Sequence, residues 1–144
     1  MPSDDTAAVR IGRQPLHALL AHVPNALFIG ALITDVVYWR TADIMWGDFS
    51  DWLLAFGALF AVLAAVAGIV DFLVVRRNRT GAGAFHAWGS VVVLVLAILN
   101  NFVHSRDAYT SVVPSGLILS ALTVVVLIVT GWVGGEMLYR EAGR

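Results

Sequence analysis

The sequence predicts an all-α protein, an up-down bundle of four transmembrane helices, and three observations support this fold class. Of the 144 residues, 59% are hydrophobic and 13% are charged, whereas a soluble domain carries roughly 25% charged residues. The mean hydropathy is +0.82. Four apolar runs each approach the roughly 20 residues that a helix needs to cross a bilayer. The chain has no cysteine, which excludes disulfides, thiolate metal ligands and covalently attached c-type haem.

The four runs follow one another with only short polar connections, so the sequence leaves no room for a soluble domain. They cover about residues 16–39, 52–75, 84–103 and 112–132. The first run lacks a small-residue cleavage site, so we expect it to be retained rather than removed as a signal peptide. We therefore expect a single four-helix domain over residues 16–140, with tails over residues 1–15 and 141–144.

The arginines predict the orientation, because the chain has no lysine. In a four-span topology, the two termini and the connection between the second and third helices lie on one face. That face holds seven of the nine arginines: Arg10, Arg13, Arg76, Arg77, Arg79, Arg140 and Arg144. The positive-inside rule then places both termini in the cytoplasm of a multi-pass protein of the bacterial inner membrane.

Polar residues from several helices converge near that cytoplasmic face. His17 and His22 stand at the start of the first helix, Asp71 near the end of the second, and His86 at the start of the third. The up-down threading brings them to about the same membrane depth. Ionisable groups in membrane helices are rare and costly, so we expect a functional site there.

A b-type haem is the first chemistry that fits these residues. It needs two imidazoles from different helices, and His22 and His86 meet that requirement. Gly30 belongs to a row of small residues, with Ala26 and His22, that would let a flat cofactor approach. Arg76 would pair with the haem propionates at the membrane boundary.

A metal ion is the second chemistry that fits. His17 and His22 lie on different faces of a straight helix, but Pro24 would let the regular helix begin later and the two rings converge. His17, His22, Asp71 and His86 would then suit Zn²⁺ or non-haem Fe²⁺. The residues alone leave both alternatives open.

Two further polar residues, Asp35 and His104, lie toward the opposite face. Asp35 lies about one helical turn inside the outer boundary and is a functional candidate by default. The competing structural explanation is a hydrogen bond from Asp35 to Asn100 or Asn101. His104 follows His86 by 18 residues, which is five turns or about 27 Å of helix. We expect His104 to be a helix-end residue, with a quinone or proton site as the alternative.

Four segments, HALLAHVPNALFIGALITD, AGIVDFL, HAWGSVVVLVLAILN and GWVGGEMLYR, together resemble the bacterial four-helix membrane family catalogued as domain of unknown function 2231. The resemblance covers about residues 16–140, although Ala18 stands where the family often has proline. Family members occur alone or fused to Rieske-type and cytochrome c-type modules, which implies a redox setting. The resemblance marks His17, His22, Asp71, His86, Trp132, Gly134, Gly135 and Glu136.

The leading interpretation is a small b-type cytochrome that binds one haem near the cytoplasmic face. As a membrane oxidoreductase or electron-transfer protein, it would exchange electrons with a quinone or a redox partner. The alternatives are a membrane protein with a His/Asp metal site, a non-catalytic anchor subunit, and a proton-coupled exporter that uses Asp35. We expect a lipid bilayer as surroundings and no nucleic acid partner, and the rows of small residues permit a homodimer.

Overall fold

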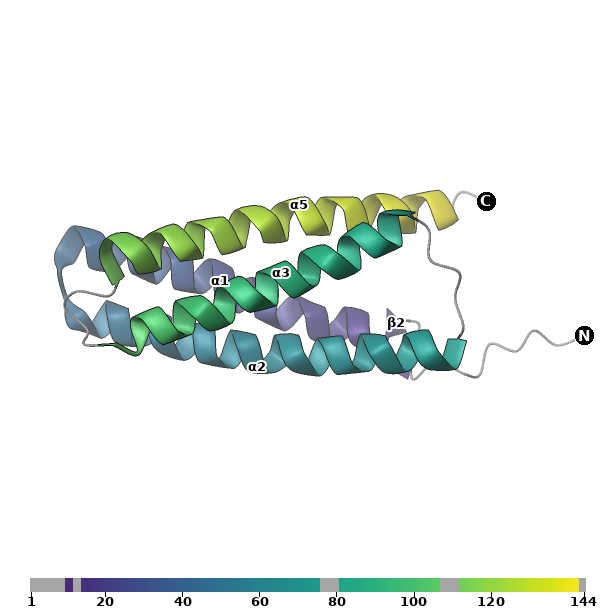
Figure 1. The fold of residues 1–144 in the computed structure, drawn as a ribbon, viewed down its shortest axis with the longest axis horizontal. Coiled ribbons are helices and arrows are strands. Elements are labelled where there is room, and N and C mark those ends of the chain that lie inside the picture. The colour runs from purple at the N-terminus through teal and green to yellow at the C-terminus, as the bar shows by residue number, and fades with distance from the viewer. Residues whose placement is uncertain (1–9, 12–13, 76–80, 107–111, 143–144) are drawn as a thin grey trace, which may run out of the picture.

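The computed structural model consists of four long helices that run alternately in opposite directions (Figure 1). It describes the backbone of residues 10–11, 14–75, 81–106 and 112–142, and the side chains of residues 19–70, 73, 84–106 and 112–133. Each long helix contains a stretch apolar enough to cross a membrane: Leu19–Thr41, Ile44–Val70, Ala84–His104 and Val112–Val133. The predicted all-α, four-helix membrane fold is confirmed.

The helices are longer than the apolar runs predicted. A two-residue antiparallel pair, β1 (Arg10–Ile11) with β2 (Gln14–Pro15), precedes α1 (Leu16–Thr41). Then come α2 (Ile44–Val75), α3 (Gly81–His104), the π-helical turn η1 (Val112–Gly116) and α5 (Leu117–Ala142). Helix α1 is continuous through Pro24, so the alternative in which the helix begins near that proline is wrong. Membrane helices tolerate proline where neighbouring groups satisfy the freed carbonyl.

The polar connection expected over residues 40–51 is mostly helix, because two caps turn the chain sharply between α1 and α2. Ala42 adopts a left-handed conformation with φ of 54°, and its N–H donates to the Tyr38 carbonyl at 2.7 Å, which closes α1. Asp43 Oδ1 then accepts the Met45 N–H at 3.1 Å and caps the start of α2. Helix α2 therefore begins at Ile44, eight residues before the start that its apolar run predicted.

The helices pack most closely as two pairs, α1 with α2 and α3 with α5. The core between the pairs is small and apolar, and it consists of Phe28, Ala31, Leu54, Val93, Ala97 and Leu127. Gly57 permits the closest approach of α1 and α2, because a Cβ there would lie 2.5 Å from Phe28 Cε1.

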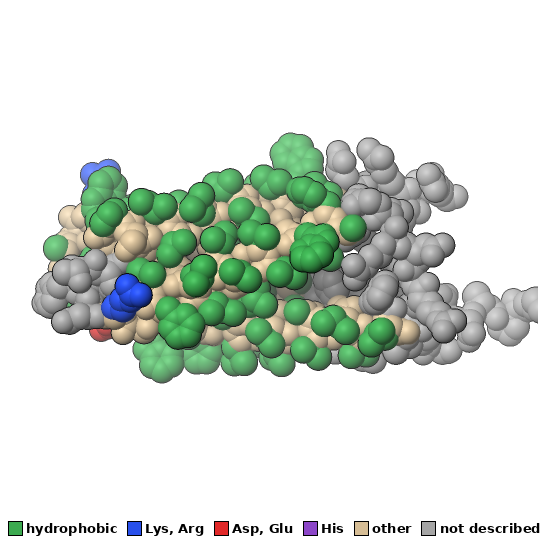
Figure 2. Space-filling model, viewed as in Figure 1, with side chains coloured by type: hydrophobic (Ala, Val, Ile, Leu, Met, Phe, Trp, Pro, Cys, Tyr) green, Lys and Arg blue, Asp and Glu red, His purple; other side chains and the backbone are tan. Residues whose placement is uncertain are grey.

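The outer surface of the bundle is apolar, as a lipid-facing surface should be. Figure 2 shows hydrophobic side chains along nearly the whole described length of one face, with arginine visible only at one end. Large side chains are more than half exposed on every helix, among them Ile33, Trp52, Leu73, Trp88, Phe102 and Trp132. In water such a surface would favour aggregation, whereas in a bilayer it contacts the lipid chains.

Burial is uneven along the bundle. Among the described side chains, the last buried residue of α2 is Ala64 and the first buried residue of α3 is Val93, so both helices bury their side chains toward one end. At that end lie Asp35, Ser50, Asn100, His104 and Ser120, all buried, and we call it the polar end. The opposite end, where α3 begins, is called the His86 end.

Candidate functional site

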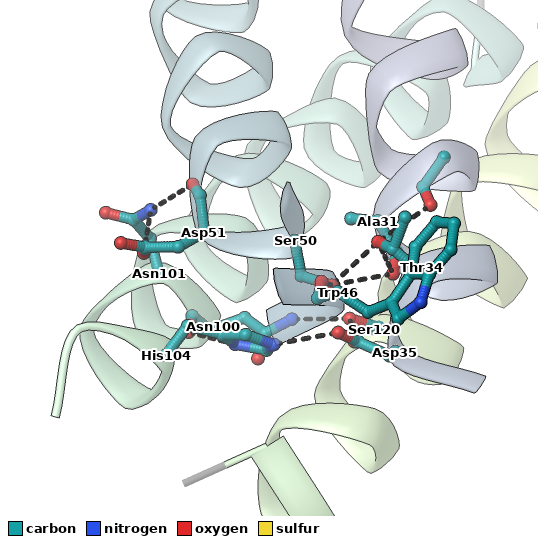
Figure 3. A network of polar contacts seen from close by, with 11 residues as sticks. Ala31, Thr34, Asp35, Trp46, Ser50, Asp51, Asn100, Asn101, His104 and Ser120 are labelled. Carbon is teal, nitrogen blue, oxygen red and sulfur yellow. Dashed lines mark hydrogen bonds and ion pairs between the residues drawn. The ribbon is translucent and has the colours of Figure 1, made fainter. Parts of the chain in front are cut away.

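The polar end holds a hydrogen-bonded aspartate–histidine pair that joins α1 and α3. Asp35 Oδ1 lies 2.9 Å from His104 Nε2, and both side chains have no exposed surface (Figure 3). Asp35 is on the buried row of α1, and His104 is the last residue of α3, where the chain leaves the helix. Asp35 and His104 are 69 positions apart in the chain and belong to two different predicted membrane spans, and their side chains meet.

Helix α5 contributes the second partner of Asp35. Ser120 Oγ lies 2.5 Å from Asp35 Oδ2, so each carboxylate oxygen has one partner from a different helix. The three residue types resemble a hydrolase triad, but the order of contacts differs. In such a triad the serine bonds to histidine, whereas here Ser120 bonds to the carboxylate, so the imidazole does not activate the hydroxyl.

Asn100 links Ser120 to His104, and the two orientations of its amide differ in the partners that they give to its nitrogen and oxygen. In the orientation drawn in Figure 3, the amide nitrogen lies 2.7 Å from Ser120 Oγ. In the reversed orientation, the nitrogen donates to the Gly116 carbonyl at 3.2 Å and to His104 Nδ1 at 3.1 Å, and the oxygen faces Ser120 Oγ at 2.7 Å. Only the reversed orientation gives both amide atoms partners of the correct polarity.

Two backbone features position the imidazole of His104. Its Nδ1 lies 3.0 Å from the carbonyl of Asn100, one turn earlier in the same helix. Gly116 brings the start of the fourth span against the ring, since a Cβ at residue 116 would lie 2.6 Å from His104 Cε1. The ring is therefore held in place by its own helix on one side and by a glycine on the other.

Polar contacts also join the remaining helix pairs at this end. Thr34 Oγ1 and Ser50 Oγ are 2.7 Å apart and connect α1 to α2. The Asn101 amide donates to the carbonyl and to the carboxylate of Asp51, each at 3.2 Å, which connects α3 to α2. Asp51 also interacts electrostatically with His104. Described polar contacts thus join all four spans at the polar end.

At the His86 end, one described contact connects α3 to α5. His86 Nδ1 lies 3.1 Å from the Thr130 carbonyl, and the ring is half-buried. Gly89 allows the two helices to approach, because a Cβ there would clash with the Thr130 side chain. His86 thus has a defined ring orientation.

The other site residues predicted for this end are not brought together in the described contacts. His22 is exposed, and Gly30 is half-buried with Leu53 near its Cα. The side chains of His17, Asp71 and Arg76 lie outside the described residues. Among the described side chains, no group of three or more His, Asp or Glu residues is arranged to hold a metal ion.

The row of small residues misidentified the inner face of α1. Sequence spacing placed His22, Ala26 and Gly30 on the inner row, but His22 and Ala26 are exposed. The buried residues of α1 are instead Pro24, Phe28, Ala31, Asp35 and Tyr38. The large rings of Phe28 and Tyr38 fill the interior, which a small-residue rule does not anticipate.

The polar end was only partly anticipated from the sequence. Asp35 was singled out, but its partners are His104 and Ser120, and the expected direct bond to Asn100 or Asn101 is wrong. His104 was expected to be a plain helix-end residue, yet it is buried. Its membrane depth was the available signal, since up-down threading places it at the same face as Asp35.

A membrane bundle of four apolar helices with a buried polar cluster at one end is the class of protein that these features define. The chain matches the model of the family described as predicted membrane protein (DUF2231) over residues 13–143. It therefore belongs to that family, which the sequence resemblance had suggested. No curated protein and no solved structure matches the chain.

Proposed function

We propose that the protein binds and releases a proton within the membrane at the Asp35–His104 pair, as part of a proton-coupled activity. The observation that carries this proposal is the full burial of both side chains, 2.9 Å apart, inside predicted membrane spans. An aspartate and an imidazole can share a proton, so the pair can change its charge without a large change in structure.

Stability alone is a weak reason to bury such a pair. Removing two charges from water costs several kcal/mol per ion, and well-packed apolar residues of similar volume often stabilise a protein equally well. Hydrogen bonds between membrane helices contribute only about 0.6–2 kcal/mol each. Ionisable residues within membrane helices accordingly mark proton and ion sites more often than structural ones.

The position of His104 suggests where the proton enters. It is the last residue of α3, and the next two residues, Ser105 and Arg106, are exposed. Toward the His86 end, the same helices are separated by the apolar core residues Val93, Ala97 and Leu127. We propose that the pair exchanges its proton with the water at the polar end.

Infrared difference spectroscopy of the purified protein in lipid, recorded while the pH is changed, tests this proposal. We expect a carboxylic acid C=O band that rises as the pH falls and that is absent from Asp35→Asn. The matched control is Asp48→Asn, because Asp48 is exposed on α2 near the same end. A spectrum of the Asp35 carboxyl that stays constant over the accessible pH range would reduce the pair to a static connection between helices.

The membrane and the orientation belong to the same proposal. From the distribution of arginines, we propose a bacterial inner membrane with both termini in the cytoplasm, so that the polar end faces the outside. Reporter fusions test this orientation. A cytoplasmically active reporter joined after residue 144 should be active, and one inserted after Arg106 should be inactive. The opposite result would reverse the side from which the proton enters.

A second candidate function, electron transfer by a b-type haem, is favoured by one observation at the His86 end. Ligating histidines usually donate one ring N–H to a carboxylate, a backbone carbonyl or water, which fixes the orientation of the ring. The contact between His86 Nδ1 and the Thr130 carbonyl has this geometry. His86 thus fits an axial ligand role, whereas exposed His22 does not fit the opposite ligand of a haem inside the bundle.

When bound, haem would supply one-electron transfer to or from a quinone or a redox protein. The absorption spectrum of the protein, purified with haem supplied during expression, tests the candidate. A haem absorption spectrum that His86→Ala abolishes and His22→Ala leaves intact is the expected result. A colourless protein with stoichiometric zinc or iron would favour the metal alternative, and one that binds neither would exclude both.

A further inference from the structure

We infer that Asn100 is a positioning residue that decides whether Asp35 or His104 holds the proton of the pair. The inference rests on the proposed function, because it concerns the same site. It starts from the two orientations of the Asn100 amide, which require different arrangements of protons on the groups that surround it.

In the orientation drawn in Figure 3, the amide nitrogen donates to Ser120 Oγ. The Ser120 hydroxyl must then donate to Asp35 Oδ2, and His104 Nε2–H donates to Oδ1, so Asp35 is an ionised carboxylate. His104 Nδ1 faces the Asn100 backbone carbonyl at 3.0 Å and needs a proton to bond with it. This orientation therefore corresponds to an ion pair between a carboxylate and an imidazolium.

In the reversed orientation, the amide nitrogen donates to His104 Nδ1, so that nitrogen carries no proton and the ring is neutral. The backbone carbonyl of Asn100, 3.0 Å from Nδ1, is then not bonded to the ring. The amide oxygen accepts from the Ser120 hydroxyl at 2.7 Å. The contact between Ser120 Oγ and Asp35 Oδ2 then needs a proton from Asp35, which is a carboxylic acid. The reversed orientation corresponds to a pair of neutral groups.

The two forms contain the same number of protons and have the same net charge. Reversal of the amide removes the proton from His104 Nδ1, adds one to Asp35 Oδ2 and turns the Ser120 hydroxyl. The reversed form satisfies both atoms of the amide and separates no charge, which a low-dielectric interior favours. Asn100 therefore holds the neutral form in the resting protein.

Other charged groups act on the pair from one further helix. Asp51 on α2 interacts electrostatically with His104, and a carboxylate at that position favours the imidazolium. From the described part of α5 and η1, the site receives the Ser120 hydroxyl and the Gly116 carbonyl, neither of them charged. The Asn100 amide thus opposes the effect of Asp51.

The test replaces Asn100 and observes the ring of His104 directly. In Asn100→Leu, the remaining described partner of Nδ1 is the backbone carbonyl of residue 100, which requires a protonated nitrogen. Nitrogen-15 NMR of histidine-labelled protein in lipid nanodiscs should show Nδ1 of His104 change from a non-protonated to a protonated ring nitrogen. The carboxylic acid C=O band of Asp35 should disappear in parallel.

Asn100→Asp serves as a second variant, because it preserves the shape of the side chain if the leucine variant does not fold. Its ionised carboxylate accepts a proton from Nδ1 and should also give the doubly protonated ring. The matched controls are Asn25→Leu and Asn25→Asp, which change an asparagine of α1 near the opposite end of the bundle. Both controls should retain the resonances of the wild-type His104 ring.

The outcomes separate this inference from the proposed function. If Nδ1 stays non-protonated and the Asp35 band persists in both Asn100 variants, Asn100 does not position the proton. If the wild-type Asp35 band does not respond to pH but the Asn100 variants still change the ring, the inference holds and the proposed function fails. If the wild-type band responds to pH and the Asn100 variants leave the ring unchanged, only the proposed function survives.

Discussion

The two ends of this bundle are built differently, although both carry histidines of the same helix. At the polar end, His104 is buried, and described polar contacts join all four spans. At the His86 end, the half-buried ring of His86 contacts the Thr130 carbonyl and joins α3 to α5. The ring at the polar end bonds to a carboxylate on another helix, and the ring at the other end contacts a backbone carbonyl.

The two ends of the bundle also differ in how firmly their helices are held. The polar end is fixed by described polar contacts among all four spans. Among the described side chains, fewer are buried near the His86 end, so their packing constrains the helix positions there less. A binding partner or cofactor would therefore meet less resistance at the His86 end, and a proton site is better protected at the polar end.

Removal of Asp35 should produce the largest effect. Asp35→Ala leaves His104 and Ser120 buried without the carboxylate, and we expect a loss of about 3–5 kcal/mol in the free energy of unfolding. Unfolding of the protein in bicelles measures it. The control, Asp48→Ala at an exposed site, should change stability by less than about 0.5 kcal/mol. An equally small effect for Asp35 would mean that the polar end does not hold the bundle together.

The next prediction concerns the glycine against the His104 ring. Gly116→Ala would place a Cβ 2.6 Å from Cε1 of that ring, and displacement of a packed side chain costs about 1–3 kcal/mol. Gly131→Ala is the control, because nothing lies within 4 Å of its added Cβ. The control should stabilise the helix by about 0.5–1 kcal/mol in the same unfolding measurement. If Gly116→Ala also increased the free energy of unfolding, the His104 ring would have room to move.

A smaller loss of unfolding free energy is expected from a substitution at the His86 end. His86→Ala removes one contact between helices, and such contacts contribute about 0.6–2 kcal/mol in membrane proteins. His22→Ala should leave the unfolding free energy within about 0.5 kcal/mol of wild type, because His22 is exposed. If His86→Ala destabilises the protein as much as Asp35→Ala does, the contrast between the two ends is lost.

The smallest effect should come from the turn beside the polar end. Ala42 adopts φ of 54°, a conformation that costs an L-residue about 1–2 kcal/mol and costs glycine little. Ala42→Gly should therefore stabilise the protein by about 0.5 kcal/mol, after the greater chain entropy of glycine is subtracted. A shift of the thermal unfolding midpoint to higher temperature is the readout, and a shift to lower temperature would contradict the argument.

Much of the fold could be predicted from the sequence, because the length of a membrane helix depends on bilayer thickness and on apolar composition alone. The helix boundaries could not be predicted from the sequence, and α2 is the clearest case. Its first turns contain Asp48 and Asp51, which suggested a connecting loop. The cap at Asp43 and the apolar residues Ile44 and Met45 extend the helix through these positions.

The candidate site was harder to predict, because it depends on which face of each helix is buried. A membrane helix is apolar on all sides, so the usual amphipathic pattern gives no phase. The row of small residues that contains His22 and Gly30 predicts the wrong buried face of α1. The buried face instead includes Phe28 and Asp35. In α1, Asp35 was a better indicator of the inner face than Gly30.

The close approach of Gly116 to His104 also restricts how this family can vary during evolution. While a histidine occupies position 104, a side chain at position 116 would collide with its ring. A descendant that lost the histidine would be free to replace the glycine, whereas the reverse order of changes would be selected against. Related sequences that carry the histidine should therefore also carry the glycine, and the histidine should be the first of the two to change.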